Sequence, residues 1–246
     1  MLQKGLYKYY KEQYKVIDKN YHIAKENFDI EAIHDLRVGI KKIRALFKLV
    51  GNITPLGFKA KKHFVPIKNL FKAAGLLRDI QIQQVLLKKY SENQTITYKA
   101  LESYLEKLND DSGKTLMKAL EKFNLGVLDN KLQKIRVALQ EIDEDILIVS
   151  SINLVNECFV KIDKLKTNED EESIHDIRTH LKDALYILKL LEKHSPNFHY
   201  EINSRKLKNT GDLLGEWHDK VVFIERLNQF LQTNHKDEDE TNQYIA

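Results

Sequence analysis

The sequence contains few of the residues that interrupt or cross-link a chain. Its 246 residues include one cysteine, three prolines and nine glycines. The single cysteine excludes a disulfide within the chain, and Cys158 lies in an apolar stretch typical of a small buried side chain rather than a nucleophile. So few prolines and glycines leave little material for the turns of a many-stranded sheet. We therefore expect an all-α fold.

Long apolar runs are also absent. The most apolar stretch, residues 146–160, is interrupted by serines, asparagines and a glutamate, so it is too polar to cross a bilayer. The first residues interleave lysine with tyrosine and lack the apolar segment of a signal peptide. These patterns predict a soluble cytoplasmic protein with no membrane partner.

Charge is distributed unevenly along the chain. Residues 1–90 contain 19 Lys and Arg against 7 Asp and Glu, whereas the remainder contains 21 against 29. Such an asymmetry favours a local polyanion site over a generally cationic protein. Residues 236–246 include a run of acids and form, by this pattern, an acidic tail.

Two blocks of sequence occur twice in the same order. Ile-His-Asp-Leu-Arg at 33–37 returns as Ile-His-Asp-Ile-Arg at 174–178, a shift of 141 residues. This order predicts an internal duplication within one domain spanning 1–246, with the first repeat at about 1–125 and the second at about 126–235. At the same shift Lys41 aligns with Lys182 and Lys48 with Lys189; at a shift of 140 the second block aligns Lys68 with Lys208, Gly75 with Gly215, and Asp79 with Asp219.

Apolar periodicity and capping patterns predict helices along most of the chain, several of them ending near a glycine. The predicted ranges are 2–26, 30–50, 58–74, 76–91, 95–109, 112–124, 127–148, 150–166, 172–193, 198–213 and 216–233.

The repeated segments each predict a helix with an apolar face and a cationic face. In the first copy, five cationic side chains fall within about 80° of arc over roughly 21 Å, opposite the apolar residues. The second copy has four within about 60°. These side chains are His34, Arg37, Lys41, Arg44 and Lys48, then His175, Arg178, Lys182 and Lys189.

No acid lies within either cationic face, so like charges three or four residues apart cost a few tenths of a kcal/mol per pair. An ordinary solvated face is the alternative, but arginine at matching positions offers a planar fork that suits phosphate oxygens. The pattern predicts an extended or symmetric anion as ligand. The second block adds Lys68, Lys72, Arg78, Lys208 and His218, with Asp79 and Asp219 interpreted as orienting the cationic groups.

Together these motifs resemble the conserved histidine α-helical domain, the CHAD family, over about residues 1–235. The family signature is a histidine followed by basic residues at +3, +7, +8 and +10. The matching residues are His34, Arg37, Lys41, Lys42 and Arg44, then His175, Arg178, Lys182 and Tyr186, and the leucine-glycine…aspartate motifs Gly75 to Asp79 and Leu214 to Asp219.

The resemblance implies two four-helix bundles related by a pseudo-twofold axis, with basic helices lining a central cavity that binds inorganic polyphosphate. Asp183 and Leu185 stand where the second copy should carry basic residues, which predicts stronger binding by the first half. We expect noncatalytic binding with no cofactor and no bound metal. We expect a cytoplasmic protein that can associate with polyphosphate granules. The resemblance identifies no protein partner.

Two other functions are weighed against this one. The doublets His34-Asp35, His175-Asp176 and His218-Asp219 are typical of metal-dependent phosphohydrolases, with His22 or His63 as further ligands, but the neighbouring cations would repel a divalent ion. Single-stranded nucleic acid binding would use the tyrosines and lysines of the first helix, since bases stack on rings interleaved with basic residues.

Overall fold

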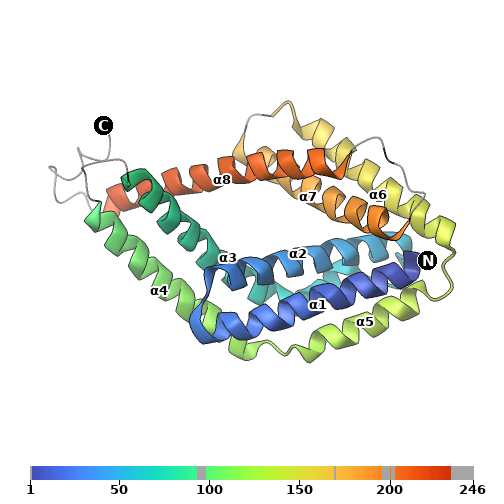
Figure 1. Cartoon of the computed structure of the whole chain (residues 1–246). Helices are drawn as coiled ribbons and strands as arrows, with labels where there is room; N and C mark the ends of the chain where they lie inside the picture. The colour runs from blue at the N-terminus through green and yellow to red at the C-terminus, as the bar shows by residue number, and fades with distance from the viewer. Residues whose placement is uncertain (1, 93–97, 169, 196–199, 201–202, 234–246) are drawn as a thin grey trace.

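The computed structural model describes residues 2–92, 98–168, 170–195, 200 and 203–233, and within these ranges all regular secondary structure is helical (Figure 1). The prediction of an all-α fold is therefore confirmed. None of the helices in these ranges combines the length and apolar content needed to cross a bilayer. The helices are α1 (Leu2–Asn27), α2 (Ile30–Ile53), α3 (Ala60–Ser91), α4 (Lys99–Lys122), α5 (Gly126–Leu139), α6 (Glu144–Leu165), α7 (Glu171–His194) and α8 (Ser204–Thr233).

Several predicted helix ends were wrong. Gly75 lies inside α3 and Gly215 inside α8, so each of these long helices was divided in two by the sequence pattern. A glycine inside a helix costs about 1 kcal/mol relative to alanine, which does not suffice to end a helix whose neighbours pack well. Conversely, one predicted helix over 127–148 is two helices, because Asp143 accepts a hydrogen bond from the backbone N–H of Asp145 and starts α6.

The two helices with the repeated motif begin in the same way. The carboxylate of Asp29 accepts a hydrogen bond from the N–H of Ala32 at 2.7 Å, and that of Asp170 accepts one from the N–H of Ser173 at 2.8 Å. Such N-caps typically contribute about 1 kcal/mol and fix where a helix starts. Each cap precedes its motif histidine by five residues, so His34 and His175 both lie in the second turn of their helices.

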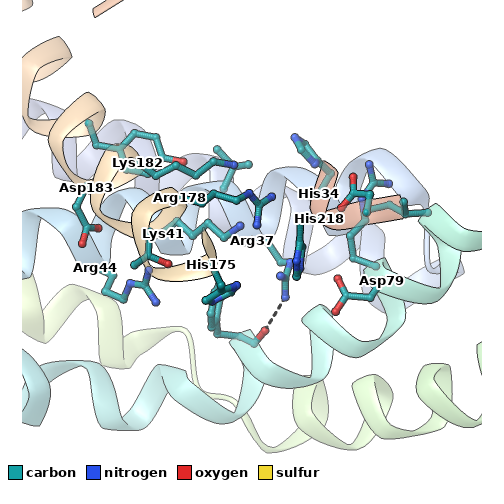
Figure 2. A pocket seen from close by; sticks show the side chains of 17 residues that line it. His34, Arg37, Lys41, Arg44, Asp79, His175, Arg178, Lys182, Asp183 and His218 are labelled. Carbon is teal, nitrogen blue, oxygen red and sulfur yellow. Dashed lines mark hydrogen bonds between the residues drawn. The ribbon is translucent and has the colours of Figure 1, made fainter. Parts of the chain in front are cut away.

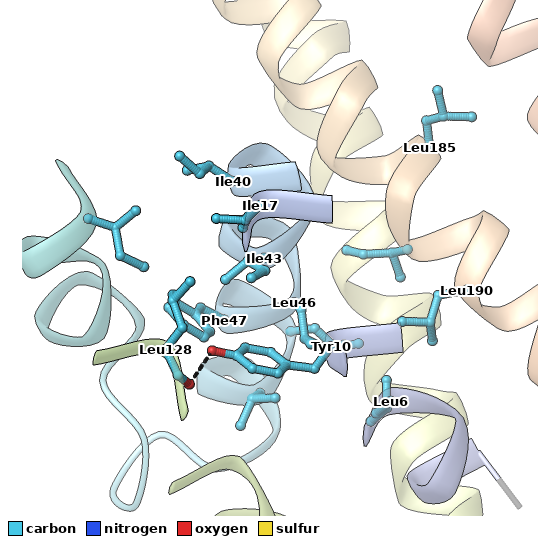
Figure 3. Close-up of a cluster of buried hydrophobic side chains, with 14 of the residues drawn as sticks. Leu6, Tyr10, Ile17, Ile40, Ile43, Leu46, Phe47, Leu128, Leu185 and Leu190 are labelled. Carbon is cyan, nitrogen blue, oxygen red and sulfur yellow. Dashed lines mark hydrogen bonds between the residues drawn. The ribbon is translucent and has the colours of Figure 1, made fainter. Parts of the chain in front are cut away.

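The main core lies where the apolar faces of α1, α2 and α7 meet, and it extends to α3, α5 and α6 (Figure 3). Leu6, Phe47 and Leu190 are almost fully buried there. The Tyr10 hydroxyl donates to the carbonyl oxygen of Leu128 at 2.6 Å, which ties α1 to α5. Full burial of each such side chain stabilises the fold by about 1.5–3 kcal/mol.

A smaller core holds the ends of α3, α4 and α8 together. Leu87, Leu105 and Phe230 are buried in it, and the ring centroids of Tyr104 and Phe230 lie 5.3 Å apart. In addition, α3 packs against α2, α8 packs against α7, and α2 and α7 pack against each other. Because α3 also contacts α8, these four helices form a closed ring of neighbours.

Candidate functional site

A pocket with a volume of about 350 Å³ opens between α2, α3, α7 and α8 (Figure 2). Nine of its lining residues carry cationic or histidine side chains, and within the described part of the chain none of them forms an ion pair with a carboxylate. All nine are residues that the sequence predicted for the site. They are His34, Arg37, Lys41, Arg44, Arg78, His175, Arg178, Lys182 and His218.

The remaining predicted cations lie outside this pocket. Lys48 forms an ion pair with the buried Asp183, and the Nζ of Lys208 lies 4.0 Å from the Oδ2 of Asp212. The side chains of Lys68 and Lys72 are exposed on α3. Lys42 of α2 and Lys189 of α7 are near each other, since the charge of Lys189 lowers the pKa of Lys42, after burial as the larger cause.

Arg37 is held by contacts with α3. Its Nη1 donates to the carbonyl oxygen of Phe71 at 3.1 Å, and its guanidinium carbon lies 5.0 Å from the centre of the Phe71 ring. A Cβ atom at Gly75 would come within 2.2 Å of the same Nη1. Gly75 is therefore required for this approach, which shows why glycine stands inside a helix at this position.

Arg44 also lies near the Phe71 ring, and near that of Phe64. Its guanidinium carbon is 5.6 Å from the centre of the Phe71 ring and 6.0 Å from that of Phe64. The Nε atoms of Arg44, Arg78 and Arg178 are buried and have no hydrogen-bond partner among the described residues. A buried donor without an acceptor costs about 1–3 kcal/mol, more for a charged group, so these guanidiniums are ready to receive an anion.

Three histidines, His34, His175 and His218, line the pocket. The rings of His175 and His218 lie 5.5 Å apart at an angle of 56°. Burial, and then the charge of the nearby Arg78, lower the pKa of His34. Burial followed by the charge of Arg178 likewise lowers the pKa of His218. An anion in the pocket would reverse these shifts by stabilising the protonated rings.

Lys41 is strongly affected by burial and by the cations around it. Burial, together with the charges of Arg37, Lys182 and Arg178, lowers the pKa of Lys41 to about 7. Burial and the charge of Arg178 also lower the pKa of Lys182. Figure 2 shows Arg37, Lys41 and Arg178 converging in the middle of the pocket. A site that holds so many cations this close favours a ligand with several negative charges.

Three acids also line the pocket. Asp79 lies near Arg37 and His218; burial raises the pKa of this carboxyl, while the charge of Arg37 opposes the rise. Arg37 donates its hydrogen bond to the Phe71 carbonyl, so the orienting role predicted for Asp79 and Asp219 would act through charge rather than direct contact. Asp183, the third acid, is bound to Lys48.

Several lining residues were not predicted from the sequence. Phe71 and Val38 line the pocket together with Thr179 and Ile82, as does Tyr186, which was matched to the family motif but not assigned to the site. Phe71 follows the apolar pattern of an ordinary core residue, so its contacts with two guanidiniums gave no signal in the sequence. Tyr186 did have one, since it stands at +11 of the second motif.

Comparisons with known proteins agree on one family. The model of the CHAD domain matches residues 8–228. A crystal structure of the CHAD domain from the plant Ricinus communis superposes with a TM-score of 0.74 at 18% identity, covering 98% of this chain and 83% of that one. A likeness at this level of identity concerns the fold. No curated protein matches the sequence.

Proposed function

The chain belongs to the CHAD family, and we propose that its pocket binds inorganic polyphosphate without catalysing a reaction. The observation that carries this proposal is the set of nine cationic or histidine side chains converging from four helices, with three buried guanidinium Nε atoms left without an acceptor. Polyphosphate offers a row of charged oxygens and no bases to read. Its affinity must come from charge and from hydrogen bonds to oxygen, which this lining supplies.

We further propose that the pocket is a central basic cavity built by internal duplication. Adding 141 to the bounds of α2 gives residues 171–194, which are the bounds of α7. The same shift brings α1 close to α6 and α3 close to α8. These bounds favour a repeat of three helices, α1–α3 and α6–α8, over the four-helix unit expected from the resemblance. The helices α4 and α5 would then connect the repeats.

The metal-dependent phosphohydrolase receives less support from the geometry. Catalysis of that kind needs histidine and carboxylate ligands converging on the metal. Among the residues that the structure describes, no three or more His, Cys, Asp or Glu side chains are grouped so that they could hold a metal ion. Phosphate release from polyphosphate with Mg²⁺ or Mn²⁺ would nevertheless reject the noncatalytic proposal.

Nucleic acid binding is also less well supported. Tyr10 is buried with its hydroxyl bound to a backbone carbonyl, and Arg136 lies 5.6 Å from the centre of the Tyr7 ring. In the pocket itself, Phe71 is covered by two guanidiniums. Rings engaged in this way offer little surface on which bases can stack.

A binding titration with polyphosphate and with RNA tests the proposal. The double variant Arg37→Ala, Arg178→Ala removes one guanidinium from each half, and each charged hydrogen bond contributes about 1.5–3 kcal/mol, so affinity for polyphosphate should fall at least about 100-fold. The matched control is Lys107→Ala, Lys118→Ala on the exposed face of α4. Unchanged affinity in the first variant, with an unchanged circular dichroism spectrum, refutes the site. Equal competition by RNA of the same charge refutes the specificity.

A further inference from the structure

The cationic face of α7 continues beyond the pocket. Lys189 and Lys193 lie on the same side of the helix as Arg178 and Lys182, within about 60° of arc. Both are exposed. Lys193 lies about 16 Å along the helix from Lys182, at the end of α7 that meets α1. The sequence predicted Lys189 as part of the site, and it now stands between the pocket and this end.

At that end, α7 is joined to a groove on α1. Lys193 Nζ lies 2.9 Å and 3.2 Å from the two carboxylate oxygens of Glu12. Glu12 lines a groove between α1 and α5, two helices that run side by side (Figure 1). The other lining residues of this groove are Lys4, Tyr7, Lys8, Lys11, Lys15 and Arg136.

The groove contains a second set of unpaired cations. Its four lysines are exposed, fall within about 60° of arc and extend over about 16 Å of α1. None of them, nor Arg136, forms an ion pair among the residues that the structure describes. Glu12 is the single acid in the lining, and Lys193 already binds it. Lysines at this spacing repel one another, as do the cations of the pocket.

Lys42 of α2 lines neither the pocket nor the groove but interacts electrostatically with residues beside both. Its pKa is lowered by burial, then by the charge of Lys189 and more weakly by that of Lys193, while the charges of Asp35 and Glu12 raise it. Lys42 is therefore near residues of both α7 and α1. Cations follow one another from Lys182 through Lys42 and Lys189 to the groove.

We propose that a long polyanion leaves the pocket along Lys42 and Lys189 and continues in the groove between α1 and α5. This inference rests on the proposed function and adds a dependence on chain length. A short chain occupies the pocket alone, whereas a longer one also neutralises the lysines of α1. The groove suits the same phosphate chain because its lining offers charge, with Tyr7 as its one ring and that ring facing Arg136.

The test compares tripolyphosphate with a polyphosphate long enough to reach from Arg178 to Lys4. The groove variant is Lys4→Gln, Lys8→Gln, Lys11→Gln, Lys15→Gln. It should bind tripolyphosphate within about twofold of the native affinity and the long chain at least about tenfold more weakly. The slope of log K against log salt for the long chain should also become shallower by about 3, given about 0.7 per neutralised phosphate on a flexible strand.

The control removes the same charge elsewhere, with Lys99, Lys107, Lys118 and Lys122 of α4 replaced by Gln. Equal weakening by this control, or equal weakening of short and long chains by the groove variant, overturns the inference. The bridging variant Lys42→Gln, Lys189→Gln should also weaken the long chain selectively. If it leaves long-chain binding intact, the groove and the pocket are not connected and the inference fails.

The double variant of the pocket separates this inference from the proposed function. Arg37→Ala, Arg178→Ala should weaken both chain lengths. If it weakens neither, the proposed function fails, whatever the groove variant does. If it weakens both while the groove variant weakens neither, the pocket is retained and the groove is rejected. Circular dichroism spectra of all variants establish that each is folded.

Discussion

Polyphosphate binding should weaken as pH rises through 7, because Lys41 must be protonated in the complex. In the free protein the pKa of this lysine is about 7, against an ordinary value of 10.5. At pH 6 the free site already holds the proton, so binding needs no uptake. At pH 8 only about one free site in ten holds it, and affinity should fall about tenfold between these pH values from Lys41 alone.

The stability of the free protein should change with pH in the opposite direction. Below about pH 7 both folded and unfolded chains carry the proton on Lys41, so the folded state bears the full cost of the buried charge. Between about 7 and 10.5 the unfolded chain binds more protons, and stability rises with pH. An anion bound in the pocket raises the pKa of Lys41 back toward its ordinary value, so polyphosphate stabilises the protein most at the lower pH values, where the free protein is least stable. Thermal unfolding across this pH range, with and without polyphosphate, measures how the stability of the free protein and of the complex changes with pH.

Calorimetry provides the direct assay. Titration at pH 8 in two buffers of different ionisation enthalpy should give an uptake approaching one proton per site from Lys41, with a further contribution from His34 and His218, whose pKa values are also lowered in the free protein. Lys41→Arg keeps the charge at both pH values, so it should lose the lysine part of the pH dependence. If the affinity of Lys41→Arg for polyphosphate still falls between pH 6 and pH 8 by as much as that of the native protein, the assignment to Lys41 is refuted.

Three substitutions test other features of the pocket. Gly75→Ala should keep the free energy of unfolding within about 1 kcal/mol of the native value. It should nevertheless weaken polyphosphate binding, since its Cβ displaces Arg37. The control is Gly215→Ala, whose Cβ would meet its nearest atom at 3.5 Å and which should bind normally in the same titration. Phe71→Leu should weaken binding about fivefold or more by removing a ring that holds two guanidiniums, at about 0.5–1 kcal/mol each; native affinity would contradict this role. Asp183→Asn should strengthen binding by removing an acid from the lining and lower the free energy of unfolding by about 1–3 kcal/mol, measured by urea denaturation; a loss of affinity would contradict it.

The cationic faces could be predicted from the sequence because they depend on helix geometry alone. His34, Arg37 and Lys41 share a face in any α-helix, and both copies of the motif were placed correctly on α2 and α7. The partner of Lys48 could not be predicted in this way, because Asp183 lies 135 residues away. The sequence does place Asp183 at +8 of the second motif, but only the packing of α7 on α2 brings this carboxylate to Lys48.

Glycine shows the limit of reading helix ends from sequence. The same residue that ends a helix also permits a close approach, and local sequence does not distinguish the two. At Gly75 the approaching group is a guanidinium from another helix, so the need for glycine is visible only in a tertiary contact. The helix boundary predicted at Gly75 is therefore wrong, although the glycine does lie against a residue of the pocket. Phe71 was missed for a related reason, since a ring beneath two arginines has the same local pattern as a core ring.

The proposed difference between the two halves of the pocket has a structural argument in addition to the missing charges of the second motif. The proposed duplication places Gly211 of α8 at the position of Phe71, and a Cβ at Gly211 would meet no atom within 4 Å. Arg37 is therefore fixed by a ring and a carbonyl, whereas Arg178, among the described residues, has no aromatic ring beneath it and a buried Nε without a partner. Ordering a free arginine on binding costs about 0.5–1.5 kcal/mol that a fixed one has already lost. The first half should thus bind phosphate more strongly, even where the two halves offer the same side chain.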